Sequence, residues 1–577
     1  MATLTKNLFW GQGERDHRLD VVEGHWPDDV NGSVVIVGPD KRAPGGHWFG
    51  EQGLLEKIRL VPDGKGRIQV EHRRVETTVQ RIRRWLPFLF ANVEFAEVSP
   101  FGVSNLANTN VLTIGGRMFL GYDAGRPVEI DPETLRHLTP VGSNREWLQS
   151  VPGVLEPLCA VAAHAASDEE AGCLWFVNYT QISPPDVAAP TYIARWDLEG
   201  PVQRWRVTGM SPFDSIHDVK VTENHVVFTD LPFVVEPEMI QGAPRATRNQ
   251  DHTKLWIVAK ADLEAHPPGT TVRAREVRIP MPTGHLFADF EEIDGLLRIV
   301  LQQIPLSDLM LTIGDDSVSH ATGETIDPDY RGLIALSVQP SVLGTYLIDP
   351  AAGEVVRADL AIDEERVWGG LLIASDTSRP EARAHQRQVW SAGVGFDPDL
   401  VSEDWWSLYG DATDGLVAPA NLPTSAIPGA LARIDVESAK VAEVWSYERG
   451  AFPSPPTFVP RRGATDPDDG YIVVVVHQDG DKEIQIFDAA HIAAGPLARA
   501  TAPHFNPPLL LHSCWAADRV GRRPSTYHVT IGQDVAGALA ALPGVFASMM
   551  RMGKAITEAK QLEKKAGAKG AASRQAP

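Results

Sequence analysis

The stretch YLIDPAAGEVVRADL (residues 346–360) consists of a strand-like run, an acidic turn at Asp349 and a second strand-like run. An aspartate in a tight turn accepts hydrogen bonds from the backbone N–H groups that follow it, so the stretch predicts a β-hairpin. The same plan occurs in VEIDPETLRHL (128–138), ARWDLEGPVQRWRV (194–207) and ARIDVESAKVAEVW (432–445). Hairpins of one plan, spaced by many tens of residues, favour the blades of a β-propeller. Unrelated hairpins within β-sandwich domains are the alternative.

Short strand-like runs dominate the chain from Gly32 to about residue 530. Each has roughly four to ten residues, is rich in Val, Ile, Tyr, Trp and Phe, and is bounded by Gly, Pro, Asp or Asn. Long stretches of helical periodicity are nearly absent before the C-terminus. The sequence therefore predicts an all-β fold. We expect three inserted stretches to form a cap of loops and helices over one face: 76–108, 231–252 and 302–330.

The C-terminal part has a different composition. From Asp534 onward helix formers replace strand formers, and residues 551–577 contain seven Lys or Arg against two Glu. We expect a propeller domain over residues 1–533 and a helical, basic and partly disordered extension over 534–577. One reading of the extension is an amphipathic helix that contacts an anionic membrane and delivers a lipophilic substrate. The other is a helix packed on the domain, followed by a disordered tail.

Composition limits the classes of function. The formal net charge of −22 disfavours binding to nucleic acid, whose phosphates it would repel. The three cysteines show no CxxC spacing, which indicates neither a disulfide framework nor a zinc cluster and fits a reducing compartment. We see no signal peptide and no apolar run of about 18 residues. The predicted location is the cytoplasm, with peripheral membrane contact as a further expectation.

Four of the 18 histidines stand in distinctive contexts. They are His164 in AVAAHAASDEEAG, His217 in SIHDVKVTENHVVFTDLP, His285 in GHLFADFEEIDG and His512 in PPLLLHSCW. Neutral imidazoles are the commonest ligands of transition metals, and a site built only of nitrogen suits iron, copper, zinc or nickel. Residues so far apart can meet only where a closed fold brings distant loops to one axis. A propeller provides such an axis, so we predict a four-histidine metal site.

Other residues near these motifs receive different interpretations. His504 lies eight residues before His512, but the position after the GPLAR strand and before the CW pair favours His512 as the ligand. His225 lies inside a strand and is interpreted as a surface or core residue, and His47 in GGHWFG as part of a structural turn. Carboxylates beside strand ends are usually solvated or pair with local backbone, which is our reading of Asp218, Glu223, Glu291 and Glu292.

With these motifs the chain resembles the carotenoid cleavage oxygenases, non-haem iron enzymes that include apocarotenoid oxygenases, stilbene cleavage enzymes and the retinoid isomerase of the eye. The resemblance runs from about residue 20 to residue 515. Besides the histidine motifs it rests on PDDVNGSVVIVGPD, GGHWFGEQGLLEKIRL, NTNVLTIGGRMFLGYDAGRPVEIDPETL and DPDDGYIVVVVHQDGDKEIQIFDAAHIAAGPLARATAP. It implies a seven-bladed propeller with one Fe(II) on its axis and dioxygen as co-substrate. The implied ligands are His164, His217, His285 and His512.

The chain departs from the pattern of this family around the metal. The family commonly orients three of its histidines with glutamates. Asp123 stands at the first of these places, where we interpret it as the acceptor for a ligand imidazole, and Pro455 stands at the second and offers no accepting side chain. At the third, the nearest match TSRPEA offers Ser378, with Asp376 or Glu381 as substitutes, and Ser513 replaces a usual glycine. Losing such carboxylates typically costs about 10–100-fold in metal affinity or activity. The metal is then held more loosely, or backbone carbonyls and water replace the carboxylates.

The resemblance implies oxidative cleavage of a conjugated C=C bond in a carotenoid-like or apocarotenoid-like polyene, giving two carbonyl products. Such a substrate calls for a long apolar tunnel. RRWLPFLFANVEF (83–95) and LPFVVEPEMI (231–240) are candidates for its mouth, unless they merely pack between cap and propeller.

Alternative functions are cleavage of a stilbene or phenylpropene, isomerisation of a double bond, and binding of a polyene without turnover. The stilbene-cleaving branch typically has a lysine where this chain has Tyr122, which argues against that branch. Loss of turnover would be consistent with Pro455.

Overall fold

The structure is a computed structural model of the chain. It describes residues 6–540, 550, 551, 554 and 557, with gaps at residues 7, 12, 42–46, 94–95, 181–188, 235, 237–238, 240–244, 336–337, 375–383 and 518–524. Most of the predicted extension over 534–577 therefore lies outside the described residues.

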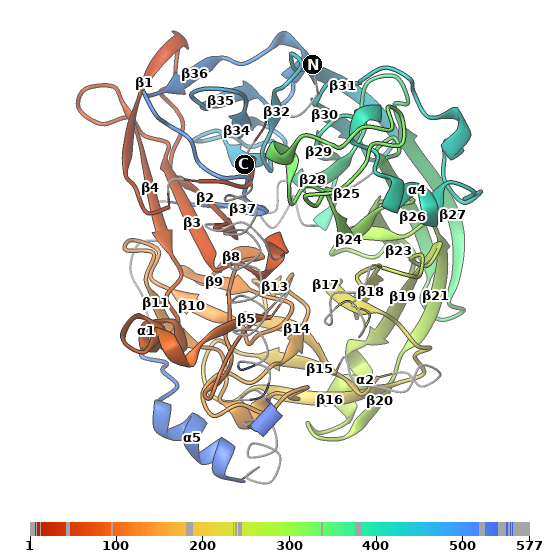
Figure 1. Ribbon diagram of the computed structural model, residues 1–577. Helices are drawn as coiled ribbons and strands as arrows, with labels where there is room; N and C mark the ends of the chain where they lie inside the picture. Colours follow the sequence, from red (N-terminus) through yellow and green to blue (C-terminus); the bar gives the residue numbers. More distant parts are fainter. Residues whose placement is uncertain are drawn as a thin grey trace, which may run out of the picture.

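Mostly antiparallel β-sheets stand around a central axis and follow one another in sequence order (Figure 1). The prediction of an all-β fold is confirmed. Five of these sheets have the following strands, in spatial order: β11 (His137–Pro140), β10 (Val128–Ile130), β9 (Arg117–Gly121) and β8 (Asn110–Ile114); β12 (Ala160–Val161), β14 (Cys173–Tyr179), β15 (Thr191–Trp196), β16 (Gln203–Thr208) and β20 (Thr271–Arg273), with β13 (Ala166–Asp168) on β14; β17 (Ser215–Val221), β18 (His225–Leu231), β19 (His252–Ala259) and β21 (Arg275–Pro280); β22 (Thr283–Ala288), β23 (Leu297–Gln303), β26 (Val342–Asp349) and β27 (Glu354–Ile362); β28 (Gly370–Ala374), β29 (Gln388–Gly393), β30 (Ala430–Asp435) and β31 (Lys440–Ser446).

A ten-stranded sheet closes the ring by joining the two ends of the domain. Its strands, in spatial order, are β32 (Phe452–Pro453), β34 (Gly470–His477), β35 (Glu483–Asp488), β36 (Ala498–Thr501), β1 (His17–Gly24), β4 (Ile68–Arg74), β3 (Gly53–Arg59), β2 (Ser33–Pro39) and β37 (His512–Ala516), with β33 (Thr457–Pro460) on β34. Two antiparallel pairs, β1 with β36 and β2 with β37, connect the N-terminal strands to the C-terminal ones. His512 consequently lies opposite Val37.

The four stretches of the sequence repeat are antiparallel pairs near the outer edges of their sheets, namely β10–β11, β15–β16, β26–β27 and β30–β31. In three of them the turn aspartate accepts hydrogen bonds as predicted. Asp131 Oδ1, for example, accepts from the backbone N–H groups of Glu133 and Thr134 at 2.9 and 2.8 Å. Asp197 instead contacts the side chains of Arg195 and Gln203.

Each sheet packs between two neighbours, which explains why some strands are apolar without alternation. All eight residues of β34 are buried, as are all seven of β14. Between the β17–β21 sheet and the β22–β27 sheet the core contains Val227, Leu255 and Leu286. Complete burial of one such side chain stabilises the fold by about 1.5–3 kcal/mol.

The inserted stretches leave the ring at one common edge. β18 ends at Leu231, opposite Ser215 at the start of β17, and β23 ends at Gln303, opposite Thr283 at the start of β22. The segments that follow them, like residues 76–108 before β8, therefore emerge where the axial strands begin. They contain α1 (Thr78–Trp85), β5 (Ala91–Val93), β6 (Ala96–Ser99), β7 (Gly102–Val103), β24 (Asp308–Thr312) and β25 (Ile334–Ala335).

The α-helices with bounds inside the described residues are short. Besides α1 they are α2 (Lys260–Ala265), α4 (Glu403–Tyr409) and α5 (Ile531–Ala540). No helix in the part of the chain that the structure describes is long and apolar enough to cross a membrane.

Candidate metal centre

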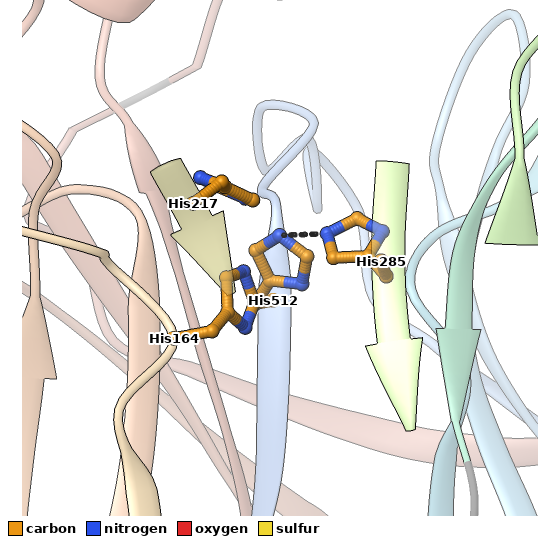
Figure 2. Close-up of side chains that lie close together, drawn as sticks. All are labelled: His164, His217, His285 and His512. Atoms are coloured by element: carbon orange, nitrogen blue, oxygen red, sulfur yellow. Dashed lines mark hydrogen bonds between the residues drawn. The ribbon is translucent and has the colours of Figure 1, made fainter. Parts of the chain in front are cut away.

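The four histidines singled out in the sequence converge on the axis of the ring (Figure 2). One ring nitrogen of each lies within 4.8 Å of the others. His217 and His285 are the third residues of β17 and β22, and His512 is the first residue of β37. His164 lies between β12 and β13. The four ligand candidates thus come from four different sheets.

Irregular strand register directs two of these side chains. The pairing of β17 with β18 shifts between Ile216 and Asp218, and that of β22 with β23 shifts between Thr283 and His285. A β-bulge interrupts the regular pairing of two strands and changes the direction of the side chain at that position. His217 and His285 both stand at such a point.

Backbone contacts tie His164 to the strand of His217. The N–H of His164 donates to the carbonyl of His217 at 3.0 Å, and the N–H of Val219 donates to the carbonyl of His164 at 3.1 Å. The buried Asp218 carboxylate extends the connection to β22, because Oδ2 accepts from the Leu286 N–H at 2.9 Å. Asp218 also forms an ion pair with Lys220. Three histidine-bearing segments are therefore linked side by side.

Two of the imidazoles are oriented through Nδ1. That of His217 contacts both Asp123 carboxylate oxygens, at 2.9 and 3.0 Å, and that of His285 contacts Gln302 Oε1 at 2.9 Å. These bonds leave Nε2 of each ring for the centre. The Nε2 atoms of His285 and His512 are 3.3 Å apart.

The donor set fits a transition metal. His164 Nε2 is buried and has no hydrogen-bond partner among the described residues. A buried polar atom without a partner is costly and requires an explanation. An ion bound between the four rings would supply the missing partner, and imidazole nitrogen suits iron, copper, zinc or nickel.

The electrostatics keep most of the cluster neutral. Burial lowers the pKa of His285 to about 4, and the neighbouring His217 adds to the effect. Burial and the nearby imidazoles also hold the pKa values of His164 and His512 well below the ordinary value. At His217 burial opposes protonation, but the Asp123 carboxylate outweighs it and raises the pKa. Three rings are thus neutral at pH 7 and available as ligands.

The departures from the family pattern have different outcomes in the structure. Asp123 reaches His217 despite its short side chain, and it also accepts from the Ala163 N–H at 3.2 Å. No described residue accepts a hydrogen bond from His512 Nδ1, and Pro455 has no side chain that could. Close to Pro455, the hydroxyl of Thr457 donates to that of Ser513, the residue after His512, at 2.7 Å. The predictions for Asp376, Ser378 and Glu381 fall outside the described residues.

Sequence reasoning missed Gln302. This residue lies directly opposite His285 in the β22–β23 pair. The signal was present, since the strand after the His285 motif, LLRIVLQQI, ends in two glutamines that could pair back onto it. The sequence alone does not give the register of that hairpin, so the pairing of Gln302 with His285 could not be predicted.

The remaining histidines lie away from the centre. His47 is buried and contacts the Leu309 carbonyl and the Phe49 N–H, as a structural turn requires. His225 contacts Glu292 at 2.8 Å, and His504 is exposed.

A cavity of about 300 Å³ adjoins three of the histidines, His164, His285 and His512. It extends along the later residues of the axial strands, away from the edge where the insertions emerge. Its walls combine apolar rings such as Phe287 and Phe458 with the charged Lys220.

Comparison with known proteins identifies the family of the chain. The family model described as retinal pigment epithelial membrane protein matches residues 10–517. The chain belongs to this family. The resemblance inferred from the sequence motifs is thereby confirmed.

Curated relatives of the chain include several oxygenases. Apocarotenoid-15,15'-oxygenase of Synechocystis sp. is 22% identical over 537 residues, which cover 87% of this chain and 94% of the relative. Chloroplastic carotenoid cleavage dioxygenase 8 of Arabidopsis thaliana is 24% identical over 541 residues, covering 86% and 82%. Resveratrol cleavage oxygenase 1 of Aspergillus fumigatus is 26% identical over 297 residues, covering 48% and 54%. The prediction of a carotenoid cleavage-type dioxygenase is confirmed at the level of the family.

Solved structures agree on the fold. A variant of the Synechocystis apocarotenoid oxygenase superposes with a TM-score of 0.61 at 18% identity, covering 90% of this chain and 100% of that chain. Lignostilbene dioxygenase of Pseudomonas brassicacearum gives a TM-score of 0.59 at 18% identity, covering 90% and 98%.

Proposed function

We propose that the protein is a non-haem Fe(II) dioxygenase that cleaves a conjugated C=C bond of a carotenoid-like or apocarotenoid-like polyene. One observation carries the proposal: four imidazole nitrogens from four sheets lie within 4.8 Å of one another. One dioxygen molecule and one C=C bond give two C=O groups. Both oxygen atoms enter the products, so the reaction needs no external reductant.

The residues around the centre have separate roles. His164, His217, His285 and His512 hold the metal, and Fe(II), when bound, supplies the redox chemistry that activates dioxygen. Asp123 and Gln302 fix the tautomers of their imidazoles, so that Nε2 carries the lone pair toward the ion. Four imidazoles, His217 included once its Nε2 binds the ion, are neutral ligands and leave the full 2+ charge on the ion, unlike a site with a carboxylate ligand.

We propose that the substrate approaches from the edge where the insertions emerge. An apolar cluster on that side includes Trp48, Leu309 and Ile313, with the partly buried Phe49 and Phe233 packed against it. Phe233 belongs to the stretch 231–240, one of the two candidates for the tunnel mouth. An apolar wall of this kind positions a polyene and excludes water from the reacting bond.

The finer architecture is part of the proposal. Counting the ten-stranded sheet as two units gives seven blades, with the insertions as a cap over one face. We divide the chain into an oxygenase domain over 1–533 and an extension over 534–577, and propose that the protein acts in the cytoplasm.

Metal reconstitution tests the proposal. Protein purified without chelators is supplied anaerobically with Fe(II), and bound iron and dioxygen consumption are measured with polyenes of graded length and with a stilbene. We expect about one iron per chain and one dioxygen consumed per bond cleaved, with aldehyde products. His217→Ala should lose iron and turnover, whereas His225→Ala, a histidine outside the cluster, should keep both.

Each outcome separates the alternatives. Turnover of the stilbene alone would replace the polyene by an aryl-alkene, and isomerised product without dioxygen uptake would make the protein an isomerase. A coloured polyene complex that persists in air would identify a binding protein. If the wild-type protein does not retain iron, the proposed iron site is wrong.

Peripheral membrane contact also belongs to the proposal. Trp85 at the end of α1 is 85% exposed and Phe88 is 65% exposed, beside the basic Arg84. Exposed aromatic rings next to cations are typical of surfaces that enter a lipid interface. We expect Trp85→Ala with Phe88→Ala to reduce flotation with anionic liposomes. Deletion of 551–577 is the parallel test for the basic tail, and unchanged flotation in both variants would exclude the contact.

A further inference from the structure

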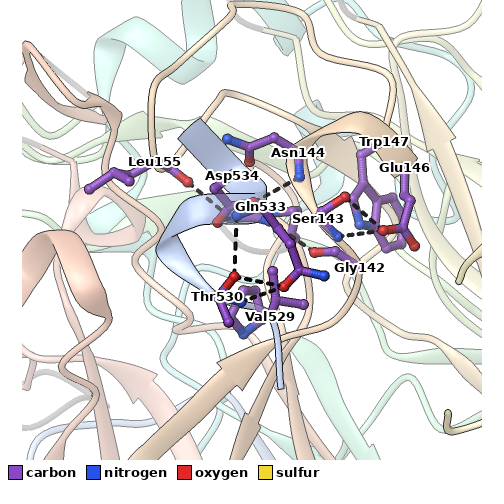
Figure 3. Close-up of polar contacts among 12 residues, drawn as sticks. Gly142, Ser143, Asn144, Glu146, Trp147, Leu155, Val529, Thr530, Gln533 and Asp534 are labelled. Atoms are coloured by element: carbon purple, nitrogen blue, oxygen red, sulfur yellow. Dashed lines mark hydrogen bonds and ion pairs between the residues drawn. The ribbon is translucent and has the colours of Figure 1, made fainter. Parts of the chain in front are cut away.

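The C-terminal segment beyond the family match is fastened to the propeller through a specific polar contact (Figure 3). Its helix, α5, starts with reciprocal bonds between Thr530 and Gln533: the Gln533 N–H donates to Thr530 Oγ1 at 3.2 Å, and the Thr530 N–H donates to Gln533 Oε1 at 2.7 Å. This capping box fixes where the helix begins. The next residue, Asp534, points into the protein.

Asp534 forms a buried ion pair with Arg126. Its two carboxylate oxygens accept from the two terminal guanidinium nitrogens at 2.9 and 3.1 Å, and Oδ1 also accepts from the Asn144 N–H at 2.9 Å. The side chains of Arg126 and Asp534 are 4% and 9% exposed. The guanidinium donates further to the carbonyls of Gly142 and Leu155, both at 2.9 Å. Such a two-pronged pair fixes geometry as well as charge.

Arg126 lies on the same turn as Asp123, between β9 and β10. At one end of this turn the Asp123 carboxylate contacts His217 Nδ1 and the Ala163 N–H, next to His164. The Asp123 carbonyl also accepts from the Val161 N–H at 3.2 Å. The turn 122–126 therefore connects the C-terminal helix, through Arg126, with His217 and the neighbour of His164, through Asp123.

Close packing supports the same attachment. Val535 packs against a cluster that contains Val79 of α1, Phe90 and Leu155. Gly537 touches the short helix η3 (Asn144–Glu146): a Cβ atom there would lie 3.1 Å from Arg145 Cγ and 3.4 Å from Asn144 Cβ. The helix thus also contacts the cap stretch 76–108.

We propose that α5 is a positioning element of the histidine centre, in which Asp534, acting through Arg126, holds the turn that aims Asp123 at His217. Removing one partner of a buried ion pair leaves the other charge without compensation. Arg126 would then turn toward water, and the 122–126 turn would move with it. This inference rests on the proposed metal site, although its effect on the turn can be observed without metal.

Asp534→Asn in the full-length protein tests it, with Glu129→Gln as the matched control. Glu129 forms a similar buried pair with Arg117 in the same sheet, at 2.9 and 2.8 Å, and lies on β10, outside residues 122–126. Two quantities are measured: hydrogen–deuterium exchange of the peptide around 118–127 in metal-free protein, and the affinity for Co(II) from its visible absorption. We expect Asp534→Asn to speed exchange of this peptide and weaken Co(II) binding about tenfold, the scale of a lost contact around a ligand histidine. Glu129→Gln can speed exchange within β9, where Glu129 lies opposite Phe119, but should leave the Co(II) affinity unchanged.

A second variant, Gly537→Val, keeps the ion pair partners but wedges α5 away from η3, and it should shift both quantities in the same direction. Unchanged Co(II) affinity in a folded Asp534→Asn protein would overturn the proposal, as would an equal loss of Co(II) affinity in Glu129→Gln. If the wild-type protein does not bind Co(II), the proposed function is contradicted. Hydrogen–deuterium exchange of the peptide 118–127 in Asp534→Asn would still show whether α5 holds the turn.

Discussion

Gln302 orients the ligand candidate His285 through a neutral amide, although it stands at none of the three positions where the family commonly has a glutamate. Its Oε1 accepts from His285 Nδ1 at 2.9 Å. We expect Gln302→Leu to weaken metal binding by about 10-fold, because the ring then loses its orientation. Gln302→Glu should preserve or tighten binding, since a carboxylate raises the basicity of the ligand.

Co(II) titration measures both variants, and Gln303→Leu is the control. Gln303 follows in the same strand and instead donates to the Pro280 carbonyl at 2.6 Å. Equal losses in Gln302→Leu and Gln303→Leu would mean that general damage to β23, not the bond to His285, is responsible.

His47 predicts a pH dependence of stability. Its Nε2 donates to the Leu309 carbonyl at 2.9 Å and its Nδ1 accepts from the Phe49 N–H at 3.2 Å, so both ring nitrogens are used by the neutral form. Burial lowers the pKa of His47 to about 4. Between the ordinary value of about 6.5 and 4, the unfolded chain binds a proton that the folded protein does not. The free energy of unfolding should therefore fall as the pH falls through this window.

Urea unfolding at a series of pH values measures this contribution. His47→Gln removes the titrating group, so its unfolding free energy should fall less steeply between pH 6.5 and 4 than that of the wild type. Identical slopes would show that His47 makes no such contribution.

At the level of strands, Asp218 connects β17 to β22. Its buried carboxylate accepts from the Leu286 N–H and pairs with Lys220. We expect Asp218→Leu to lower the free energy of unfolding by about 1–3 kcal/mol, because it leaves a buried N–H and an ammonium group without their acceptor. The double variant with Lys220→Met should recover part of the loss. If the double variant is no more stable than Asp218→Leu, the unpaired ammonium group of Lys220 does not contribute to the loss of stability.

Local sequence patterns predicted the strands and singled out the four histidines that converge, because both depend on short stretches. The hairpins at Asp131, Asp349 and Asp435 follow from one turn chemistry, and the histidine contexts are distinctive by themselves. Contacts that depend on register or on distant segments were not predictable. Gln302 faces His285 only once the β22–β23 register is known, and Arg126 and Asp534 are 408 positions apart.

For the whole molecule, closure of the ring is the decisive long-range feature. β1 pairs with both β36 and β4, so it joins the last strands to the first sheet. We expect deletion of residues 1–24 to lower the melting temperature and to abolish metal binding, because β36 and β4 then lose β1 between them and the sheet that carries His512 opens. Deletion of 551–577 serves as the comparison and should leave both unchanged. Full metal binding after loss of β1 would show that the centre forms without the closed ring.

The pairing of the first strands with the last also sets an order during protein synthesis. His164, His217 and His285 leave the ribosome before the fourth histidine is made, and β37 can find β2 only after nearly the whole domain has been translated. A nascent or prematurely terminated chain therefore lacks the complete set of ligands. The four-histidine cluster can therefore be completed only after His512 has been made, so a polypeptide that ends before this residue lacks the site proposed to bind iron.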